Sequence, residues 1–274
     1  TSNNKFFFFL WNTLERESIL SFKLLLDSIG FKNYDCRQDR SFFIPNKRFS
    51  YLFNSRISGV DDSDMCILIG TDLRKESPLI NARIRQRSKD IPKYNILNFG
   101  KIDSSNLNAI NVGDDFKSIL SLKNEKFTKI LRKSRKPLFI IGQGPLSTEN
   151  GKDLFHFILK TYNKLKLDQN WNGFNILQNH SGRVGALDLG FYNTKNLNKN
   201  YISNIYQGKY EVLYLFNTDE LDFNKIPDKT FVIYQGHHGD RAINRANLVI
   251  PTSCFTEKEG LYVNLEGRPQ ISRQ

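Results

Sequence analysis

The chain has 274 residues, enough for one large domain or two modest lobes. Its 39% hydrophobic, 13% aromatic and 25% charged residues exclude a wholly disordered, collagen-like or coiled-coil protein. The net charge of +12 predicts attraction to phosphate, anionic lipid or an acidic protein without choosing among them. The longest strongly apolar run near the start, residues 6–11, is far shorter than the ~20 residues of a membrane span, so no direct span is expected.

The order of apolar runs and helical patterns predicts an α/β protein. Short apolar runs predict strands at residues 6–10, 65–69, 94–99, 137–141, 212–216, 230–234 and 248–251. Helical spacing predicts a helix that follows Thr13, carries Leu20, Leu24, Leu25 and Ile29, and ends at Gly30. Further helices are expected at residues 78–89, 114–122, 124–134 and 151–167. This alternation is typical of doubly wound parallel sheets, with lobes expected at 1–135 and 136–274, divided near the basic stretch 126–136.

The three cysteines, Cys36, Cys66 and Cys254, are far apart in the sequence. An odd number without C-x-x-C spacing argues against a disulfide framework and against a cysteine-ligated cluster. A reducing compartment is therefore expected. The chain is also rich in Phe, Asn, Lys and Ile and poor in Ala, as A+T-rich codons favour, which indicates an organellar or similar genome.

Two glycine-rich stretches imitate phosphate-binding loops. Gly142, Gln143 and Gly144 follow a strand as in a dinucleotide fingerprint, but Ser147 replaces the third glycine. Residues 144–152 imitate a phosphate loop with too long a spacing, and Asp153 replaces the hydroxyl that would ligate magnesium. We therefore predict an ordinary strand-to-helix turn here and reject an ATPase.

His237 and His238 flank a predicted turn, and Cys254 follows downstream. They could form a metal site only in a fold that brings them together, because adjacent residues of an extended chain point to opposite sides. Without an H-x-E-x-H or similar spacing, we favour a turn in which the imidazoles bond to nearby backbone. The sequence contains no G-x-S-x-G motif of a serine hydrolase.

Basic residues gather on two predicted helices. The first set is Lys126, Lys129, Arg132 and Lys133, and the second is Arg83, Arg85 and Arg87. Such sets are usually solvated faces, and neither carries the interleaved aromatic residues or the recognisable module of a nucleic-acid-binding protein. No nucleic-acid partner is expected.

Several stretches, taken in order, resemble one protein family. They are ISGVDDSDMCILIGTDLRKESPLINARIR at 57–85, residues 136–144, GALDLG at 185–190, and QGHHGDRAINRANLVIPTSCFTEKEGLYVNLEGRPQ at 235–270. They are similar to the carboxyl-terminal region of the largest iron–sulfur subunit (75 kDa type) of respiratory complex I, NADH:ubiquinone oxidoreductase. That subunit shares its fold with molybdopterin-dependent oxidoreductases. The resemblance therefore implies two doubly wound parallel-sheet lobes of the molybdopterin oxidoreductase type.

The resemblance also identifies the loops where a pterin cofactor would bind in related enzymes. Asp72 stands where the family usually has Asn, and its negative charge would repel a phosphate-bearing ligand. Near the carboxyl end, negative charges accompany Arg268, and two glycines are expected in left-handed turns. These residues are Glu257, Glu259, Glu266, Gly260 and Gly267. We predict a structural, internally paired loop without a cofactor.

This sequence departs from the family in two ways. The family's cysteine-rich cluster region has no counterpart in the sequence, and the sequence ends at Gln274, soon after the V-N-x-E-G-R motif. We interpret this as a split subunit in which a separate cysteine-rich iron–sulfur chain docks against this one.

The resulting hypothesis is a non-catalytic structural subunit or fragment of mitochondrial complex I, on the matrix side of the inner membrane. It predicts no catalytic, cofactor-binding or metal residues, no cofactor, and other complex I subunits as partners. One alternative is a molybdopterin-dependent oxidoreductase, for which Cys36 or another side chain could ligate the metal. A second alternative is a basic organellar RNA-binding protein.

Overall fold

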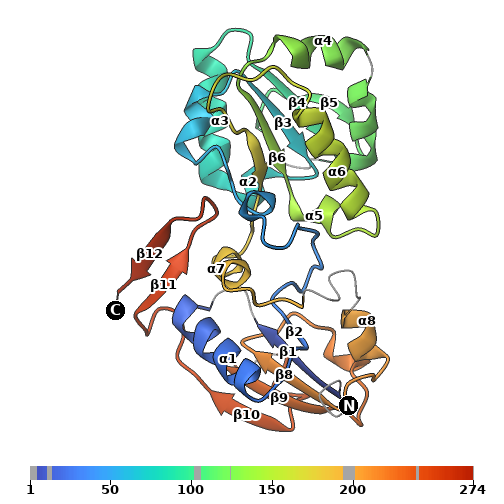
Figure 1. Ribbon diagram of the computed structural model, residues 1–274, viewed down its shortest axis with the longest axis vertical. Helices are drawn as coiled ribbons and strands as arrows, with labels where there is room; N and C mark the ends of the chain where they lie inside the picture. Colours follow the sequence, from blue (N-terminus) through green and yellow to red (C-terminus); the bar gives the residue numbers. More distant parts are fainter. Residues whose placement is uncertain are drawn as a thin grey trace. The chain divides into compact units, whose positions relative to one another are not determined.

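The structure is a computed structural model that describes residues 5–10, 14–101, 106–123, 125–193, 201–238 and 241–273. The chain forms two compact units, each built on its own parallel sheet (Figure 1). Unit 1 combines residues 1–40 with residues 180–274, and unit 2 is the continuous stretch 41–179. The boundary expected after residue 135 instead lies within unit 2, because the strand at 137–141 pairs with the strand at 65–69.

Unit 2 contains a five-stranded parallel sheet with the order β5-β4-β3-β6-β7. Its strands are β3 (Met65–Ile69), β4 (Asn95–Phe99), β5 (Ile110–Gly113), β6 (Pro137–Ile141) and β7 (Phe174–Ile176). Its helices are η2 (Arg48–Ser50), η3 (Ser58–Asp62), α2 (Leu73–Glu76), α3 (Pro78–Asp90), η4 (Phe116–Lys123), α4 (Glu125–Lys133), α5 (Gln143–Leu146) and α6 (Gly151–Tyr162). Figure 1 shows α3 and α6 on opposite sides of the sheet, so helices cover both faces.

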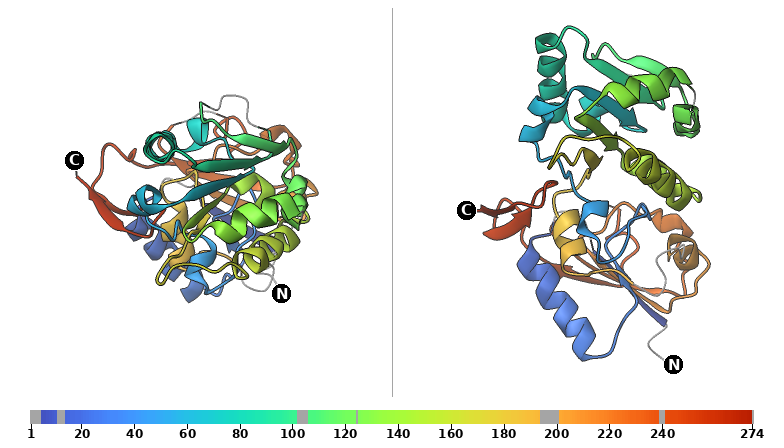
Figure 2. Two further views of the ribbon diagram at one scale, coloured as in Figure 1. Left: turned by 90° about the horizontal axis from the view of Figure 1, so that it is seen from above. Right: turned by 45° about the horizontal axis from the view of Figure 1, so that its top comes forward.

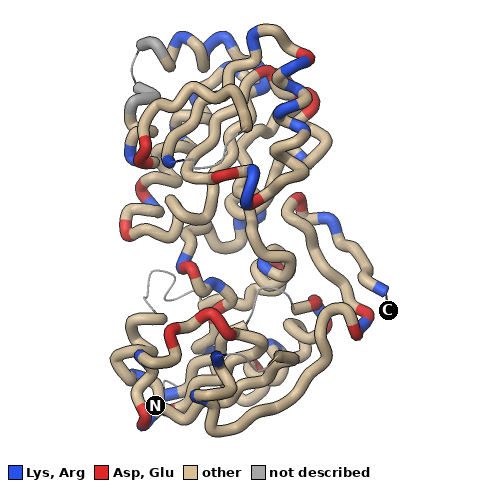
Figure 3. The backbone as a smooth tube through the Cα atoms, turned by 180° about the vertical axis from the view of Figure 1, so that it is seen from behind, with Lys and Arg blue, Asp and Glu red and all other residues tan. Residues whose placement is uncertain are grey.

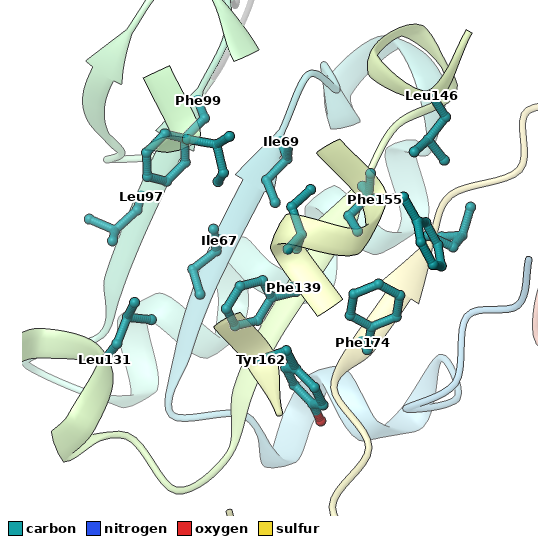
Figure 4. Close-up of a cluster of buried hydrophobic side chains, with 14 of the residues drawn as sticks. Ile67, Ile69, Leu97, Phe99, Leu131, Phe139, Leu146, Phe155, Tyr162 and Phe174 are labelled. Atoms are coloured by element: carbon teal, nitrogen blue, oxygen red, sulfur yellow. The ribbon is translucent and has the colours of Figure 1, made fainter. Parts of the chain in front are cut away.

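The core of unit 2 explains why its central strands are apolar at every position. All five residues of β3 are buried. Ile67 and Ile69 point to one side and pack in a cluster with Phe139 and with Phe155 of α6 (Figure 4). Because side chains alternate along a strand, Leu68 faces the other side, where it is also fully buried. A strand that is apolar on both faces is typical of a parallel sheet between two layers of helices.

Unit 1 contains a second five-stranded parallel sheet, with the order β10-β9-β8-β1-β2. Its strands are β1 (Phe6–Leu10), β2 (Tyr34–Asp35), β8 (Val212–Phe216), β9 (Phe231–Gly236) and β10 (Leu248–Pro251). Its helices are α1 (Arg16–Ser28), α7 (Arg183–Asp188), α8 (Tyr201–Tyr206) and η6 (Phe223–Lys225). The phenylalanines of β1 place this strand in the core, where Phe7 and Phe9 are fully buried.

Helix α1 ends as the sequence predicts. Gly30 has a φ of +82°, and the Phe31 N–H donates to the Leu26 carbonyl at 2.8 Å, which confirms a left-handed C-cap. Thr13 lies outside the described residues. The core-facing side chains are Ile19 and Leu26, whereas the apolar residues that revealed the helix are 42% to 59% exposed. These are Leu20, Leu24, Leu25 and Ile29.

An antiparallel hairpin of β11 (Gly260–Val263) and β12 (Pro269–Ser272) completes unit 1. Figure 2 shows the hairpin beside α1. The Leu261 N–H donates to a carboxylate oxygen of Glu17 at 3.1 Å, which ties the edge of the hairpin to the first turn of that helix. The hairpin lies outside the parallel sheet, so the alternation of strands and helices did not predict it.

The predicted strands at 6–10, 65–69, 137–141, 212–216 and 248–251 are confirmed to the residue, and so is the α/β class with two parallel sheets. The helix predicted at 151–167 ends earlier, at Tyr162, where the Leu165 N–H turns back to the Tyr162 carbonyl. Strands β2 and β7 were missed because they have only two and three residues, and β5 was missed because its four residues, INVG, contain no continuous apolar run. Within the described ranges, no helix is both long and apolar enough to cross a membrane.

Candidate functional site

The first candidate site is the carboxyl edge of the unit 2 sheet, where a ligand of a doubly wound protein is expected. The loops that leave β3, β4 and β6 contain Gly70, Gly100 and Gly142 and approach each other closely. Gly70 has a φ of +56°, and a Cβ added to Gly142 would lie 2.4 Å from the Gly70 carbonyl oxygen. The loops therefore contact each other through backbone, and the glycines are needed for this packing.

Three backbone donors of these loops, one at each glycine, are already engaged. The Gly70 N–H donates to the Phe99 carbonyl at 2.7 Å, the Gly100 N–H to the Gly113 carbonyl at 2.8 Å, and the Gly142 N–H to the Ile69 carbonyl at 3.0 Å. A phosphate cradle requires N–H groups that point at the ligand. These three N–H groups instead join the loops to the sheet.

Asp72 acts as the N-cap of α2. Its carboxylate accepts a hydrogen bond from the Arg74 N–H at 3.2 Å, and its own N–H donates to the Glu76 carboxylate at 2.7 Å. This reciprocal pair resembles a capping box. The Asp72 and Glu76 carboxylates do not attract a phosphate-bearing pterin, but Arg74 and Lys75 of the same helix offset their charge, and Lys75 Nζ lies 3.8 Å from Asp72 Oδ2. The poor fit of such a group therefore rests on the occupied N–H donors.

The Gly142–Gln143–Gly144 stretch forms the strand-to-helix turn that the sequence favoured. Gln143 begins the short helix α5 and is buried, and its side-chain amide donates to the Leu177 carbonyl at 2.5 Å. Two buried side-chain oxygens here, Gln143 Oε1 and Thr71 Oγ1, have no hydrogen-bond partner in the structure. Gln143 Oε1 can only accept a hydrogen bond, so of these two atoms only the Thr71 hydroxyl could donate to a phosphate.

At the corresponding edge of unit 1, charged residues lie at the end of β2 and just after it. Arg37 forms a two-point ion pair with Asp35, with distances of 3.0 Å from Nε and 2.7 Å from Nη2 to the carboxylate oxygens, and both side chains are buried. Between them, burial raises the pKa of the Cys36 thiol to about 12. Cys36 is therefore a buried thiol with little thiolate character, which disfavours it as a metal ligand.

The same edge of unit 1 brings together the histidines and the cysteine singled out in the sequence. His237 and His238 follow β9, and Cys254 follows β10, the neighbouring strand. Their possible ligand atoms all lie within 4.8 Å of one another. The two Nδ1 atoms are in hydrogen-bond contact, so the imidazoles bond to each other, which the sequence did not predict. The predicted turn extends into residues 239 and 240, which lie outside the described residues.

Residues near this group shift its titration. Burial, the neighbouring His238 and the positive charge of Lys258 lower the pKa of His237, while Glu257 opposes them. Hydrogen bonds from the Thr256 backbone and side chain lower the pKa of the Cys254 thiol. Cys254 is thus the accessible and more acidic thiol, whereas burial raises the pKa of Cys66.

The carboxyl-terminal motifs form the internally paired loop that the sequence predicts. Asn264 organises the V-N-L-E-G-R turn, because its side-chain oxygen accepts from the Glu266 N–H at 3.1 Å and the Arg268 N–H at 2.9 Å. Arg268 also pairs with Glu266 at 3.3 Å. Gly267 has the expected left-handed backbone, with a φ of +83°.

The expectation of a left-handed turn at Gly260 was wrong. No positive φ occurs there, and Gly260 is required for a different reason. A Cβ at this position would lie 2.6 Å from Cβ of Glu15, just before α1. Glu15 in turn pairs with Lys258 at 2.6 Å, so the T-E-K-E-G motif packs against the start of α1.

The basic residues give little support to a nucleic-acid site. Arg83 pairs with Asp61, and Arg87 donates from Nε to the Ser63 carbonyl at 2.9 Å. Figure 3 shows Lys and Arg along α4, consistent with a solvated helix face. Two of the three arginines in the predicted set therefore stabilise unit 2 itself.

Sequence reasoning missed two ion pairs of unit 1 that each contain a buried arginine. One joins Asp35 and Arg37, and the other joins Arg183 of α7 and Asp39 at 3.0 Å. The D-x-R-x-D spacing at residues 35–39 was the available signal, since residues two apart can share a turn around one carboxylate. Arg183 gave no such signal because its partner is distant in sequence.

Comparison with known proteins places these features in a family. A family model described as molybdopterin oxidoreductase matches residues 2–274. The chain is 36% identical over 263 residues to an NADH-quinone oxidoreductase subunit of Rickettsia felis, covering 94% of this chain and 37% of that protein. It is 36% identical over 281 residues to the NADH-ubiquinone oxidoreductase 75 kDa subunit of Reclinomonas americana, covering 96% of this chain and 40% of that protein.

Two further comparisons extend this result. A mitochondrial NADH dehydrogenase (ubiquinone) iron-sulfur protein 1 of Solanum tuberosum is 33% identical over 263 residues, covering 94% of this chain and 34% of that protein. The chain thus spans well under half the length of these relatives. A chain in the crystal structure of the formyltransferase/hydrolase complex of Methylorubrum extorquens is 13% identical, with a TM-score of 0.67 over 97% of this chain and 85% of that chain. That structure shares the fold.

Proposed function

The chain belongs to the molybdopterin oxidoreductase family, and from this premise we propose that it is a non-catalytic structural part of respiratory complex I. In this role it supports electron transfer from NADH to ubiquinone, while partner subunits carry the electrons. The observation that carries the proposal is 33% to 36% identity, along nearly the whole chain, to proteins described as subunits of this enzyme.

The carboxyl edge of the unit 2 sheet, which is closed because its loops contact each other through backbone, supports the non-catalytic part of the proposal. The N–H groups of Gly70, Gly100 and Gly142 bond within the unit, and the Asp72 and Glu76 carboxylates lie at the same edge. A phosphate-bearing cofactor would find these three donors occupied. The family fold serves here as a packed scaffold.

The cysteines support a separate source of the iron–sulfur clusters. Such clusters are usually held by four cysteine thiolates, whereas this chain has three cysteines. Cys36 and Cys66 are buried in different units, with burial raising the pKa of each thiol. We therefore propose that the clusters belong to a cysteine-rich iron–sulfur polypeptide that associates with this chain, together with other complex I subunits.

The proposed location is the matrix side of the mitochondrial inner membrane. Relatives from Candida albicans and Solanum tuberosum are described as mitochondrial, at 34% and 33% identity. In this location the net charge of +12 would favour acidic neighbouring subunits over long range. Apolar contacts would supply most of the affinity once the surfaces meet.

The test is native electrophoresis of solubilised mitochondria with NADH staining, followed by mass spectrometry of the stained band. We expect this chain in the band in equal amount with a cysteine-rich iron–sulfur chain, and the pair should persist at about 1 M salt, where the screening length is only ~3 Å. Recovery of this chain as a free monomer would contradict the proposal. Release at high salt would contradict the apolar interface.

Asp72→Asn is the variant most favourable to cofactor binding under the molybdopterin alternative. It removes one negative charge and keeps a good helix cap. We expect neither the wild-type complex nor this variant to contain molybdenum or tungsten, and NADH oxidation should be unchanged. Stoichiometric molybdenum or tungsten in this chain would establish the enzyme alternative instead. RNA that co-purifies and dissociates steeply with salt would favour the RNA-binding alternative.

A further inference from the structure

The topology of unit 1 brings three potential metal ligands to one edge of its sheet. Strands β9 and β10 are parallel neighbours, and their last residues, Gly236 and Pro251, are paired. The ladder continues for one more bond, from the Thr252 N–H to the Gly236 carbonyl at 3.1 Å. His237 and His238 directly follow β9, and Cys254 lies three residues after the end of β10. The sheet therefore determines where the three side chains meet.

The side chains form a compact and accessible group. Their possible ligand atoms lie within 4.8 Å of one another. In a tetrahedral zinc site with bonds of ~2.0–2.3 Å, ligand atoms are roughly 3.5 Å apart, so small side-chain rotations are sufficient. His238 is exposed, while His237 and Cys254 are half-buried, so an ion can reach the group from solvent.

The surroundings also suit a cation. The Glu257 carboxylate accepts a hydrogen bond from the Cys254 N–H at 2.8 Å and brings a negative charge to the loop. Lys258 is the nearby positive charge, and it forms an ion pair with Glu15 at 2.6 Å. The hydroxyl of Tyr262 in β11 is buried without a hydrogen-bond partner. Such outer groups orient and tune metal ligands.

We propose that His237, His238 and Cys254 bind one borderline-soft divalent cation of the zinc class, with a fourth position open to water. Two imidazoles and a thiolate are the ligand types that zinc prefers over magnesium or calcium. Binding separates the two imidazoles that now contact each other and moves the proton between them to the far nitrogen of its ring. The thiol proton is released to solvent.

The experiment uses the full chain, purified without a polyhistidine tag and treated with a chelator. The chain is titrated with Co²⁺ as a spectroscopic probe, and Zn²⁺ is then added as a competitor. We expect one Co²⁺ per chain, with visible bands of a four- or five-coordinate site and a near-ultraviolet thiolate charge-transfer band. One equivalent of Zn²⁺ should remove both signals.

Variants assign the ligands. Cys254→Ser should lose the charge-transfer band, and His237→Gln and His238→Gln should each weaken binding by at least the ~10-fold that loss of an outer partner costs. His156→Gln changes an exposed histidine of unit 2 and is the matched control, for which binding should be unchanged. Circular dichroism of each variant checks that the fold is retained.

Two results would overturn the proposal. One is Co²⁺ binding by the wild-type chain that is no tighter than binding by His237→Gln and His238→Gln. The other is a stoichiometric site whose spectrum is the same in Cys254→Ser. Neither result bears on the complex I assignment, which depends on co-migration with the NADH-oxidising band.

Discussion

Units 1 and 2 contain parallel sheets of the same size, yet their carboxyl edges differ. In unit 2, the loops after β3, β4 and β6 touch through backbone, and the N–H groups of their glycines bond internally. In unit 1, the edge carries the buried Asp35–Arg37 pair and the accessible group of His237, His238 and Cys254. A shared topology thus determines where the loops meet, whereas the residues in the loops determine whether the edge is closed or can bind a ligand.

The largest expected effect would come from removing the buried charge at the edge of unit 1. Asp35→Ala leaves the guanidinium of Arg37 without its two-point partner in a buried position. Breaking such a pair typically lowers the free energy of unfolding by about 3–5 kcal/mol. Urea denaturation of the full chain, followed by circular dichroism, measures this loss.

Two controls separate burial from charge. Asp222→Ala breaks the exposed Asp222–Lys225 pair of the same unit and should leave the transition almost unchanged. The double variant Asp35→Leu/Arg37→Met replaces the pair with apolar side chains and should recover much of the lost stability. Equal losses for Asp35→Ala and Asp222→Ala would show that burial of the first pair has no energetic consequence.

The closed edge of unit 2 can be tested by two alanine substitutions that are two residues apart. In Gly142→Ala, the new Cβ would lie 2.4 Å from the Gly70 carbonyl oxygen, and overpacking of this kind costs about 2–3 kcal/mol. In Gly144→Ala, the nearest atom is 3.9 Å away, and alanine favours a helix by up to ~1 kcal/mol. Thermal unfolding of both variants should therefore show opposite or very unequal shifts, and equal shifts would contradict the close approach.

The reaction rates of the three thiols test how accessible each cysteine is in solution. Cys254 is half-buried and its pKa is lowered by hydrogen bonds from Thr256, whereas burial raises the pKa of Cys36 to about 12 and also raises that of Cys66. With a disulfide reagent, one thiol of the native chain should react, and the other two should be at least ~100-fold slower because they require opening of the core. Cys254→Ser should abolish the fast phase. A fast phase that survives this substitution would place a reactive thiol elsewhere.

The smallest expected effect concerns Asp27 at the end of α1. Burial opposes the shift, but hydrogen bonds from Lys23, Lys32 and Tyr34 lower the pKa of Asp27 from 3.8 to about 2. Because the folded pKa is the lower one, this contribution is present above about pH 4 and is lost as the pH falls towards 2.

Asp27→Asn should therefore reduce stability at pH 7 by less than ~1 kcal/mol, since the ion pairs are partly exposed. The difference between the two proteins should vanish towards pH 2, as measured by thermal unfolding across this range. A difference that is the same at pH 2 and pH 7 would contradict the assigned charge interaction.

The sequence predicted the strands with long apolar runs and the turn at Gly142, because each depends on neighbouring residues alone. It did not predict that residues 1–40 join residues 180–274, since nothing local to Phe6–Leu10 shows that this strand pairs with Val212–Phe216. The proximity of Cys254 to His237 could not be predicted from the sequence either, because it depends on the pairing of β9 and β10. Close approach, as at Gly260 against Glu15, also requires the assembled fold.

The division of unit 1 between the two ends of the chain has a consequence for the timing of folding. Strand β1 needs β8, which follows more than 200 residues later, whereas unit 2 lies between them and is continuous. At synthesis rates of ~5–20 residues per second, β1 waits roughly 10–40 s for this neighbour. Unit 2 can complete its sheet during that interval, while the phenylalanine-rich β1 remains available to chaperones or to other nascent chains.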